Sequence, residues 1–515
     1  GITALIDGER FTSVDGIVTG TELERFDGIQ AVVRVEGKLG GLTGLKLDYK
    51  LWIKVWAGSG EVELTLSISK REGAAWEDYF EVKGVSVDIP LVKTEGINYV
   101  FGGKAGNHRG LVEKKAYIYQ STSDSYITAN GAKQEEVDKS GKSDKSLNTG
   151  WAAAISGNRG LGVAYRWFWQ TWPSALQIDA GGMVSAQVWA ESHEPLKLYT
   201  GVSKTTDLRL YFFNSSEEEG KIEERLKAFQ LLTIAKAPPA WYCQQTKAID
   251  SRLLDLNLDN WPEEEHEYIK LYMDKFDEVY KRLVADRDQH PNYSEGRDGY
   301  GFIDFGDGWE HPDDYQKPAK WELTWWSNNY YDHPHNFYLQ FFRTGKLKYL
   351  DYALEHEYHL MDIDTASFDP GFGIAGEYKS CPSVMHIKRY NKRYIKEDGE
   401  EDFTFMGQGG SWQFQGVESL FEAYYMTGIT PALERGLESA EFAMQRNTLN
   451  LMSGARSGGH TLEGLAVAYC HTWDEKFLKR MNEVWQIFID QATKDFSGVS
   501  KRFPYRPEYS PYVYY

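Results

Sequence analysis

The sequence predicts a multidomain α+β protein, in which an antiparallel β-sandwich over residues 1–240 is followed by an α/α toroid over residues 241–515. Alternating apolar residues in the first part, a proline pair near its end and a repeated helical pattern in the second part lead to this prediction. The chain of 515 residues is long enough to bury a sizeable core in each part.

In the first part, apolar and polar residues alternate with the period of a half-buried strand. The alternation is almost strict from Leu45 to Trp56, and it resumes from Glu61 to Ser69 after a glycine-rich turn. This pair of runs predicts a β-hairpin. Further strands are expected near residues 115–120, 162–169, 182–189 and 208–213, and the polar stretch 134–146 is expected to be a surface loop. Many strands with short turns favour a sandwich.

A helix is expected from about Ser216, because acidic residues fill its first turn. Pro238 and Pro239 end it and mark the domain boundary. After Trp261 the apolar period becomes helical, and Pro262 followed by glutamates is a typical helix start.

Three segments of the second part superimpose on one another. Each is an apolar helix that ends in an aromatic residue, a threonine and a turn, and each is followed by a second helix. The threonines are Thr344, Thr427 and Thr472. One helix pair cannot bury its own apolar face, so the pairs must stack. A solenoid and a closed toroid both fit, and long loops rich in glycine, tryptophan, asparagine and histidine favour the toroid.

The charge and the aromatic content limit the classes of ligand. A net charge of -19 repels nucleic acid and anionic lipid, so neither is an expected partner. It also repels an acidic polysaccharide, unless the binding cleft carries local positive charge. Aromatic residues make up 15% of the chain, an excess that is common in proteins that stack on sugar rings and that also fits a large core.

The cysteines and the start of the chain say little about the compartment. The three cysteines are far apart, which excludes a disulfide scaffold and a CxxC metal site. No signal peptide is visible at Gly1, which leaves open whether one has been removed. No apolar run approaches the length that spans a bilayer.

Several short motifs occur in order along nearly the whole chain. They are Gly28–Gly37, Trp56–Ser59, Arg166–Pro173, Gly201–Thr206, Asp304–Asp307, Trp326–Asp332 and Arg343–Gly345. In this order they resemble the exo-rhamnogalacturonan lyase family, also called YetA-like, in which a β-sandwich precedes an α/α toroid. Family members usually carry a further small β domain at the N-terminus, and this chain is expected to begin where their central sandwich begins.

The resemblance implies a polysaccharide lyase that acts on rhamnogalacturonan or a related uronate-containing glycan. We therefore expect an acidic polysaccharide or oligosaccharide as partner and an extracellular or periplasmic location. A lyase breaks the bond at C4 of a uronate by β-elimination. Its site must neutralise the C6 carboxylate and place a base near the C5 proton. Asparagine, histidine or arginine beside tyrosine is therefore expected on loops of the toroid.

The run from Trp325 to His335 has this content. In it, Asn328 and Asn329 could hold the carboxylate, and Tyr331 or its neighbour Tyr330 could act as base and acid. His333 and His335 flank them, and Trp325 could stack on a sugar. The alternative is a polar loop that caps the following helix.

Other candidates lie in neighbouring segments. His386 and Arg389 occur in a basic, aromatic segment, and they could act as base and as carboxylate ligand. The alternative is a solvated helix face. Trp412 and His460 occur in segments that precede the second and third repeat helices, and loops in equivalent positions of a toroid point to the same end.

Two further motifs have weaker functional interpretations. Asp304 and Asp307 could bind a hard cation such as Ca²⁺, although a simple turn also fits. In the aromatic run that begins at Arg166, alternation places Trp167 and Trp169 on one face, and packing against the toroid is favoured over sugar stacking.

Two other classes of protein remain open. A glycoside hydrolase on the same fold would need two carboxylic acids beside the scissile bond. Acidic candidates are Asp304, Asp307, Glu310, Asp332, Glu377, Glu418 and Glu463. A non-catalytic carbohydrate-binding or structural protein would keep the fold and lose the reaction.

Overall fold

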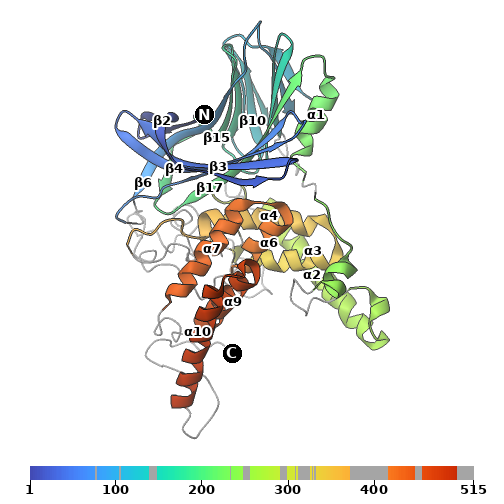
Figure 1. Cartoon of the computed structure of the whole chain (residues 1–515). Helices are drawn as coiled ribbons and strands as arrows, with labels where there is room; N and C mark the ends of the chain where they lie inside the picture. The colour runs from blue at the N-terminus through green and yellow to red at the C-terminus, as the bar shows by residue number, and fades with distance from the viewer. Residues whose placement is uncertain are drawn as a thin grey trace, which may run out of the picture.

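The computed structural model describes most of the chain. The described residues are 1–75, 78–103, 106–138, 148–231, 234–246, 256–289, 299–307, 309–310, 325–326, 329, 332–371, 416–446 and 455–495. They form a large antiparallel sheet followed by a helical part, a mixed α+β architecture (Figure 1). Within these residues, no helix is both long enough and apolar enough to span a membrane.

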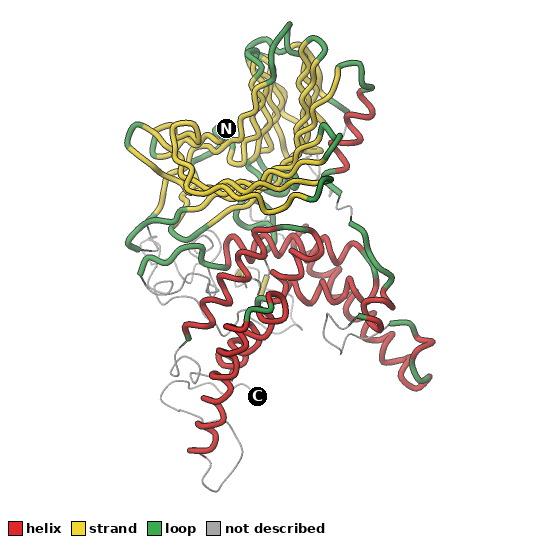
Figure 2. The backbone as a smooth tube through the Cα atoms, viewed as in Figure 1, coloured by secondary structure: helices red, strands yellow, loops and turns green. Residues whose placement is uncertain are grey.

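The N-terminal half is a single hydrogen-bonded sheet that bends strongly over itself (Figure 2). Its strands are β1 (Ile2–Ile6), β2 (Glu9–Phe26), β3 (Gln30–Gly41), β4 (Gly44–Trp56), β5 (Glu61–Ser69), β6 (Tyr79–Pro90), β7 (Asn98–Gly103), β8 (His108–Leu111), β9 (Lys115–Gln120), β10 (Ser125–Asn130), β11 (Lys133–Asp138), β12 (Asn148–Ser156), β13 (Arg159–Tyr165), β14 (Ser174–Asp179), β15 (Met183–Trp189), β16 (Leu196–Tyr199) and β17 (Ser203–Asn214).

The strand order follows two branches that meet at β1 and β6. One branch is the meander β2–β3–β4–β5, which continues through β17, β13, β12 and β7. The other runs from β6 through β15, β14, β9 and β10 to β11. The predicted hairpin is confirmed, because β4 and β5 pair from Asp48 with Ser69 to Val55 with Val62.

Two local predictions in this half are wrong. Residues 134–138 were expected in a loop, but they belong to β11, which pairs with β10. The strand expected to reach Trp169 ends at Tyr165, and the chain turns there with Trp167 in the left-handed region at φ 58°. The alternation of Trp167 and Trp169 therefore does not apply. Trp167 packs edge-on against Phe305 and Tyr358, which confirms its predicted contact with the helical part.

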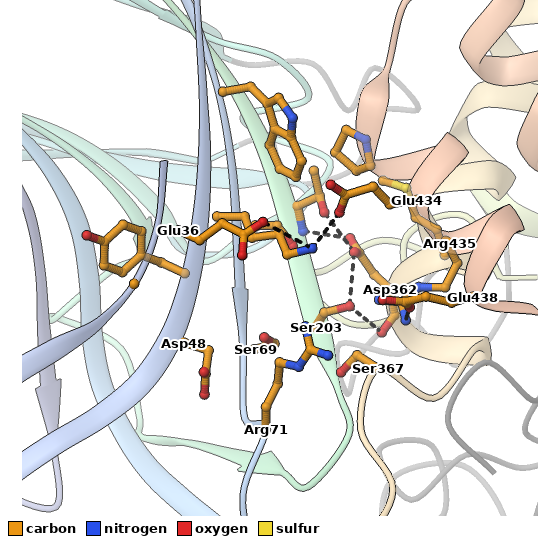
Figure 3. Close-up of a pocket in the computed structure, with 18 of the residues that line it drawn as sticks. Glu36, Asp48, Ser69, Arg71, Ser203, Asp362, Ser367, Glu434, Arg435 and Glu438 are labelled. Carbon is orange, nitrogen blue, oxygen red and sulfur yellow. Dashed lines mark hydrogen bonds and ion pairs between the residues drawn. The ribbon is translucent and has the colours of Figure 1, made fainter. Parts of the chain in front are cut away.

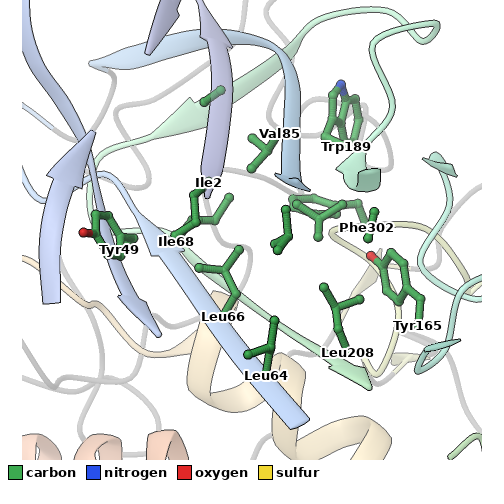
Figure 4. Close-up of a cluster of buried hydrophobic side chains, with 14 of the residues drawn as sticks. Ile2, Tyr49, Leu64, Leu66, Ile68, Val85, Tyr165, Trp189, Leu208 and Phe302 are labelled. Atoms are coloured by element: carbon green, nitrogen blue, oxygen red, sulfur yellow. The ribbon is translucent and has the colours of Figure 1, made fainter. Parts of the chain in front are cut away.

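The apolar core lies between the two parts of the bent sheet (Figure 4). Leu66, Ile68 and Leu208 come from β5 and β17, and Trp189 faces them from β15. Phe302, from the segment between α2 and α3, joins this core with its ring 5.3 Å from that of Trp189. Burying such side chains contributes about 1.5–3 kcal/mol each. The same core extends into the helices, so it anchors them to the sheet.

The helical part contains stacked hairpins. Its described elements are η1 (Trp241–Gln245), η2 (Leu258–Asn260), η3 (Glu263–Glu265), α2 (His266–Gln289), β18 (Trp309–Glu310), β19 (Trp325–Trp326), α3 (His333–Thr344), α4 (Leu347–His359), η6 (Leu360–Asp364), α6 (Glu418–Thr427), α7 (Thr430–Gln445), α9 (Ala455–Thr472) and α10 (Glu475–Asp495). The remaining helix, α1 (Glu219–Ala228), packs against β12 and β13 of the sheet (Figure 1). The pairs α3/α4, α6/α7 and α9/α10 are hairpins, with α6 between α3 and α9.

The repeat predicted from the threonines is confirmed. The hydroxyl groups of Thr344, Thr427 and Thr472 donate to the carbonyl four residues earlier, at 2.7, 2.5 and 2.6 Å. Each hydroxyl also accepts from the backbone N–H two residues later, at 3.2, 3.4 and 3.2 Å. The threonine thus closes the first helix and starts the turn in every hairpin. Closure of the hairpins into a toroid is not shown by the described residues and stays a prediction.

The residue after each threonine is left-handed, as a helix C-terminus of this kind requires. Gly345 and Gly428 have φ of 65° and 74°, where glycine carries no steric cost. The third position holds Trp473 at φ 57°. The hairpin geometry is therefore kept in the third repeat even without glycine.

Candidate functional site

Polar and ionisable residues gather in two regions of the helical part. The first, which we call the acid–histidine cluster, lies where α3 and α6 begin. It consists of Asp304, Asp307, Asn329, Asp332, His333, His335, His356, Glu357, His359, Asp364, Glu418 and Glu422. The second is a cleft between the sheet and the helices, which we call the sheet–helix cleft (Figure 3).

The starts of α3 and α6 are held side by side by Asp332. This residue precedes α3, and its carboxylate accepts a 3.1 Å hydrogen bond from the backbone N–H of Ser419 in the first turn of α6. A side chain at Gly416 would meet Asp332, with a Cβ only 2.0 Å from that of Asp332, so glycine is required there. Asp332 and Gly416, which precede these two repeat helices, therefore lie side by side, whereas most of the loops before them lies outside the described residues.

His335 joins two glutamates of α6. Its Nδ1 lies 2.9 Å from Glu422 Oε2, and its Nε2 lies 3.6 Å from Glu418 Oε2. One ligand atom from each of the three side chains lies within 4.8 Å of the others. The Glu422 side chain is 7% exposed, whereas that of Glu418 is 29% exposed. The two carboxylates therefore share one histidine but differ in their access to solvent.

The different surroundings of His335 and Glu422 shift their proton affinities. Burial opposes the charged form of His335, but the carboxylates of Glu422, Asp332 and Glu418 outweigh it and raise the pKa to about 10. Burial raises the pKa of Glu422 to about 7, and the attraction of His335 offsets only part of that rise. Near neutral pH, His335 is therefore a cation and Glu422 exchanges a proton.

A second group of ligand atoms lies deeper in the cluster. His359 Nε2 is 3.3 Å from Asp364 Oδ1 and 3.6 Å from Asp307 Oδ2. Asn329 donates to Asp364 Oδ2 from its backbone at 3.0 Å and from its side chain at 3.1 Å. The π-helical turn η6 places Asp364 beside His359, at the end of α4.

This group has ligands that suit a divalent cation. Asp307 belongs to it, as the sequence predicts, whereas Asp304 lies buried near Lys204 instead. An imidazole with two carboxylates suits zinc, manganese or iron better than calcium, which prefers a shell of oxygen atoms. The predicted calcium site therefore stays a prediction, with these three residues as the better-placed ligands.

Asn329 and His333 are inside the cluster, where both contact other side chains of the protein. Asn329 is buried, and its amide donates to protein acceptors, so it positions Asp364. Its predicted role as a uronate ligand stays a prediction. His333 packs edge-on against Phe337 and His356, and burial lowers its pKa to about 4. His333 is therefore neutral at ordinary pH.

The other predicted site residues have mixed outcomes. Trp325 belongs to the short strand β19, which pairs with β18. His460 was expected in a loop, but it lies within α9 because the helix already begins at Ala455. There its Nδ1 lies 2.8 Å from Glu463 Oε2. The remaining predicted residues, which fall outside the described ones, are Asn328, Tyr331, His386, Arg389 and Trp412.

The sheet–helix cleft lies between β3, β4, β5 and β17 on one side and η6 and α7 on the other. It encloses about 120 Å³. Asp362 of η6 forms part of its wall and accepts hydrogen bonds from the backbone and hydroxyl of Thr205, at 2.6 and 2.8 Å. The same short π-helix therefore contributes Asp362 to the cleft and Asp364 to the acid–histidine cluster (Figure 3).

Several of these residues were not found from the sequence. His359, Asp362 and Asp364 lie in a stretch, 355–364, where acids and histidines interrupt an otherwise apolar helix pattern. This interruption is the feature of the sequence that marks these three residues as candidates. Glu422 carries no comparable signal, because its partner His335 comes from another repeat.

Comparisons with known proteins assign no family. No family model matches the chain, and no curated protein matches it. Among solved structures, GH36 α-galactosidase AgaA from Geobacillus stearothermophilus is 13% identical, with 41% of this chain and 30% of that chain covered and a TM-score of 0.27. AgaB from the same organism is 13% identical, with coverage of 50% and 36% and a TM-score of 0.30.

A third similar structure is a putative aldose 1-epimerase from Escherichia coli K12. It is 12% identical, with 37% of this chain and 68% of that chain covered and a TM-score of 0.20. All three are named for reactions on sugars, but similarity at these TM-scores carries no argument about function. The chain also spans only about a third of each α-galactosidase.

Proposed function

We propose that this protein is a carbohydrate-active enzyme, and specifically a glycoside hydrolase that uses Glu418 and Glu422. The observation that carries the proposal is the pair of carboxylates around His335, of which Glu422 exchanges its proton near neutral pH. Glycosidases need two carboxyl groups in different protonation states, and their environments create that difference.

The geometry of the pair fits a retaining reaction. One oxygen of Glu418 lies within 4.8 Å of one oxygen of Glu422, which is compatible with the roughly 5–5.5 Å between the carboxyl groups of retaining glycosidases. The more exposed Glu418 is the nucleophile in this proposal, and the buried Glu422 is the acid. His335 holds both side chains and, as a cation, favours the ionised form of Glu418.

The proposed reaction has two steps. Glu422 donates its proton to the glycosidic oxygen while a Glu418 oxygen attacks the anomeric carbon, so the leaving sugar departs with a new hydroxyl group. Glu422 then accepts a proton from water as the water oxygen replaces Glu418 on the anomeric carbon. The net change is the addition of one water molecule, and both glutamates return to their starting states.

A lyase is the second candidate. Its supporting observation is Arg71, a cation in the sheet–helix cleft that favours a uronate-containing substrate, on which β-elimination is also possible. The residues predicted for that chemistry, Tyr331 and His386, lie outside the described ones. We therefore expect an acidic glycan as the partner for the hydrolase and for the lyase alike.

The experiment is product analysis on a panel of neutral and uronate-containing oligosaccharides. We expect new reducing ends, and we expect Glu422→Gln and Glu418→Gln to lower the rate by at least about a hundredfold. Azide should restore turnover to a small variant at the nucleophile, Glu418→Ala, as a glycosyl azide. Glu463→Gln is the matched control, because Glu463 occupies the corresponding position in the third repeat and pairs with its own histidine.

Three outcomes would contradict the hydrolase proposal. Unsaturated uronates as products would favour the lyase. Full activity in both glutamine variants would remove the assigned pair. Binding without any product on the whole panel would favour a non-catalytic carbohydrate-binding protein.

A further inference from the structure

Arg71 is a basic residue in the wall of the sheet–helix cleft, just after β5. Its guanidinium group points into the space near Ser69, Ser203 and Ser367 (Figure 3). Among the described residues, Arg71 has no hydrogen bond, ion pair or ring contact. A guanidinium group normally binds carboxylate or phosphate when one is within reach, so its unpaired state in a recess points to a ligand.

The other cations in the wall of the cleft are engaged. Lys50 Nζ lies 2.6 Å from Glu434 Oε2. Arg435 pairs with Glu438 and also donates to the carbonyl of Ala366. Neither of these side chains can turn to a ligand without leaving a glutamate uncompensated.

The acidic residues of the wall lie near other basic groups. Glu36 pairs with Arg34 and Asp48 with Lys38, and Asp362 attracts the buried ammonium group of Lys204. The lining itself holds five carboxylates and three basic groups, so its own charge is negative. Arg71 is the basic group of the lining that has no partner among the described residues.

The size and the polar groups of the cleft limit the ligand. A volume of about 120 Å³ accommodates roughly ten water-sized positions, which is comparable to one sugar ring with its substituents. Hydroxyl groups of Ser69, Ser203 and Ser367 line the space around Arg71. Trp52 adds an aromatic surface to the wall. These groups suit a small ligand that combines hydroxyl groups with one negative charge.

We propose that the sheet–helix cleft binds one uronate unit of an acidic glycan, with the guanidinium group of Arg71 on the C6 carboxylate. The two N–H groups of the fork match the two carboxylate oxygens, and the surrounding serines and carboxylates bind the ring hydroxyl groups. The inference rests on the proposed function in so far as the ligand is a sugar.

The test is calorimetric binding of galacturonate, galactose and acetate, separately, to the full chain. We expect galacturonate to bind more tightly than galactose or acetate. Arg71→Gln should weaken galacturonate binding by roughly ten- to a hundredfold, the effect of one charge-assisted hydrogen-bond pair. Arg71→Lys should retain part of the affinity, because it keeps the charge but loses the fork.

Arg159→Gln is the matched control. Arg159 is an exposed arginine at the β12–β13 turn that has no partner among the described residues, so galacturonate affinity should not change. Equal affinity for galacturonate in Arg71→Gln and the native protein would overturn the proposal. Acetate binding as tight as galacturonate binding would overturn its sugar part, because a simple anion site would explain both.

The outcome can be separated from that of the hydrolase proposal. Binding is also measured in the Glu422→Gln variant, which removes the proposed acid and leaves Arg71 unchanged. Arg71-dependent binding without turnover in the native protein would support the uronate site and contradict the hydrolase. Turnover of neutral glycans without Arg71-dependent binding would do the reverse.

Discussion

Replacing Asp362 with alanine should loosen the attachment of the helices to the sheet. Asp362 belongs to η6, and it accepts hydrogen bonds from Thr205 and Ser203 of β17. It is 1% exposed, and it is the main opposite charge that stabilises the buried ammonium group of Lys204. The substitution therefore removes an acceptor and leaves a buried cation with less compensation.

The expected cost follows from this geometry. Removing one of two opposite charges that are both buried costs about 3–5 kcal/mol. The lost hydrogen bonds to Thr205 belong to the same event, so they are not added to this figure. In the double variant Lys204→Met/Asp362→Ala the uncompensated charge is gone, and we expect about 2 kcal/mol to be regained.

The assay is urea unfolding of the single and double variants, followed by tryptophan fluorescence and circular dichroism. The first transition is the relevant one, because a chain of 515 residues need not unfold in one step. Asp274→Ala, on an exposed face of α2, is the control and should change stability by less than about 0.5 kcal/mol. A loss below about 1 kcal/mol in Asp362→Ala, or strictly additive effects in the double variant, would refute the reasoning.

Four further predictions concern the turns, the pH dependence of hydrolysis, the pH dependence of stability and the cation site. Gly428→Ala should lower the free energy of unfolding by about 1–2 kcal/mol, because the φ angle of Gly428 is 74°. Gly220→Ala in α1 is the control and should not lower it, and denaturation curves of the two variants make the comparison. Hydrolysis should fall as pH rises through about 7, where Glu422 loses its proton, and pH–rate profiles test this. Folding raises the pKa of His335 from 6.5 to about 10. The stability that its charge contributes is therefore complete below pH 6.5 and is lost as the pH rises through 10. Melting temperatures of His335→Gln should not show this loss. Adding zinc or manganese to chelator-treated protein should raise the melting temperature, and Asp307→Asn should abolish the rise; no shift with either metal would remove the cation prediction.

The features of the fold that could be predicted are those with a local cause. Thr427 and Gly428 set a helix end through hydrogen bonds within a few residues, so the repeat is visible in the sequence. The turn at Trp167 was missed because it depends on packing against Phe305 and Tyr358, which lie far along the chain. The alternation of apolar residues alone predicts that the strand continues through Trp167.

The same distinction explains the candidate site. Asp307 stands out because a glycine turn and a second aspartate lie beside it in the sequence. Its companions His359 and Asp364 reach it only through the packing of η6. Arg71 was missed entirely, because its unpaired state is a property of the cleft and not of its neighbours in sequence.

The most direct test of the central claim is mass spectrometry of products formed in heavy-oxygen water. The proposed reaction at Glu418 and Glu422 predicts that each cleavage adds one water molecule and places its oxygen on the new reducing end. The label should be absent when Glu422→Gln replaces the native protein. Products that lack the added water and carry a carbon–carbon double bond would contradict the hydrolase and identify a lyase instead.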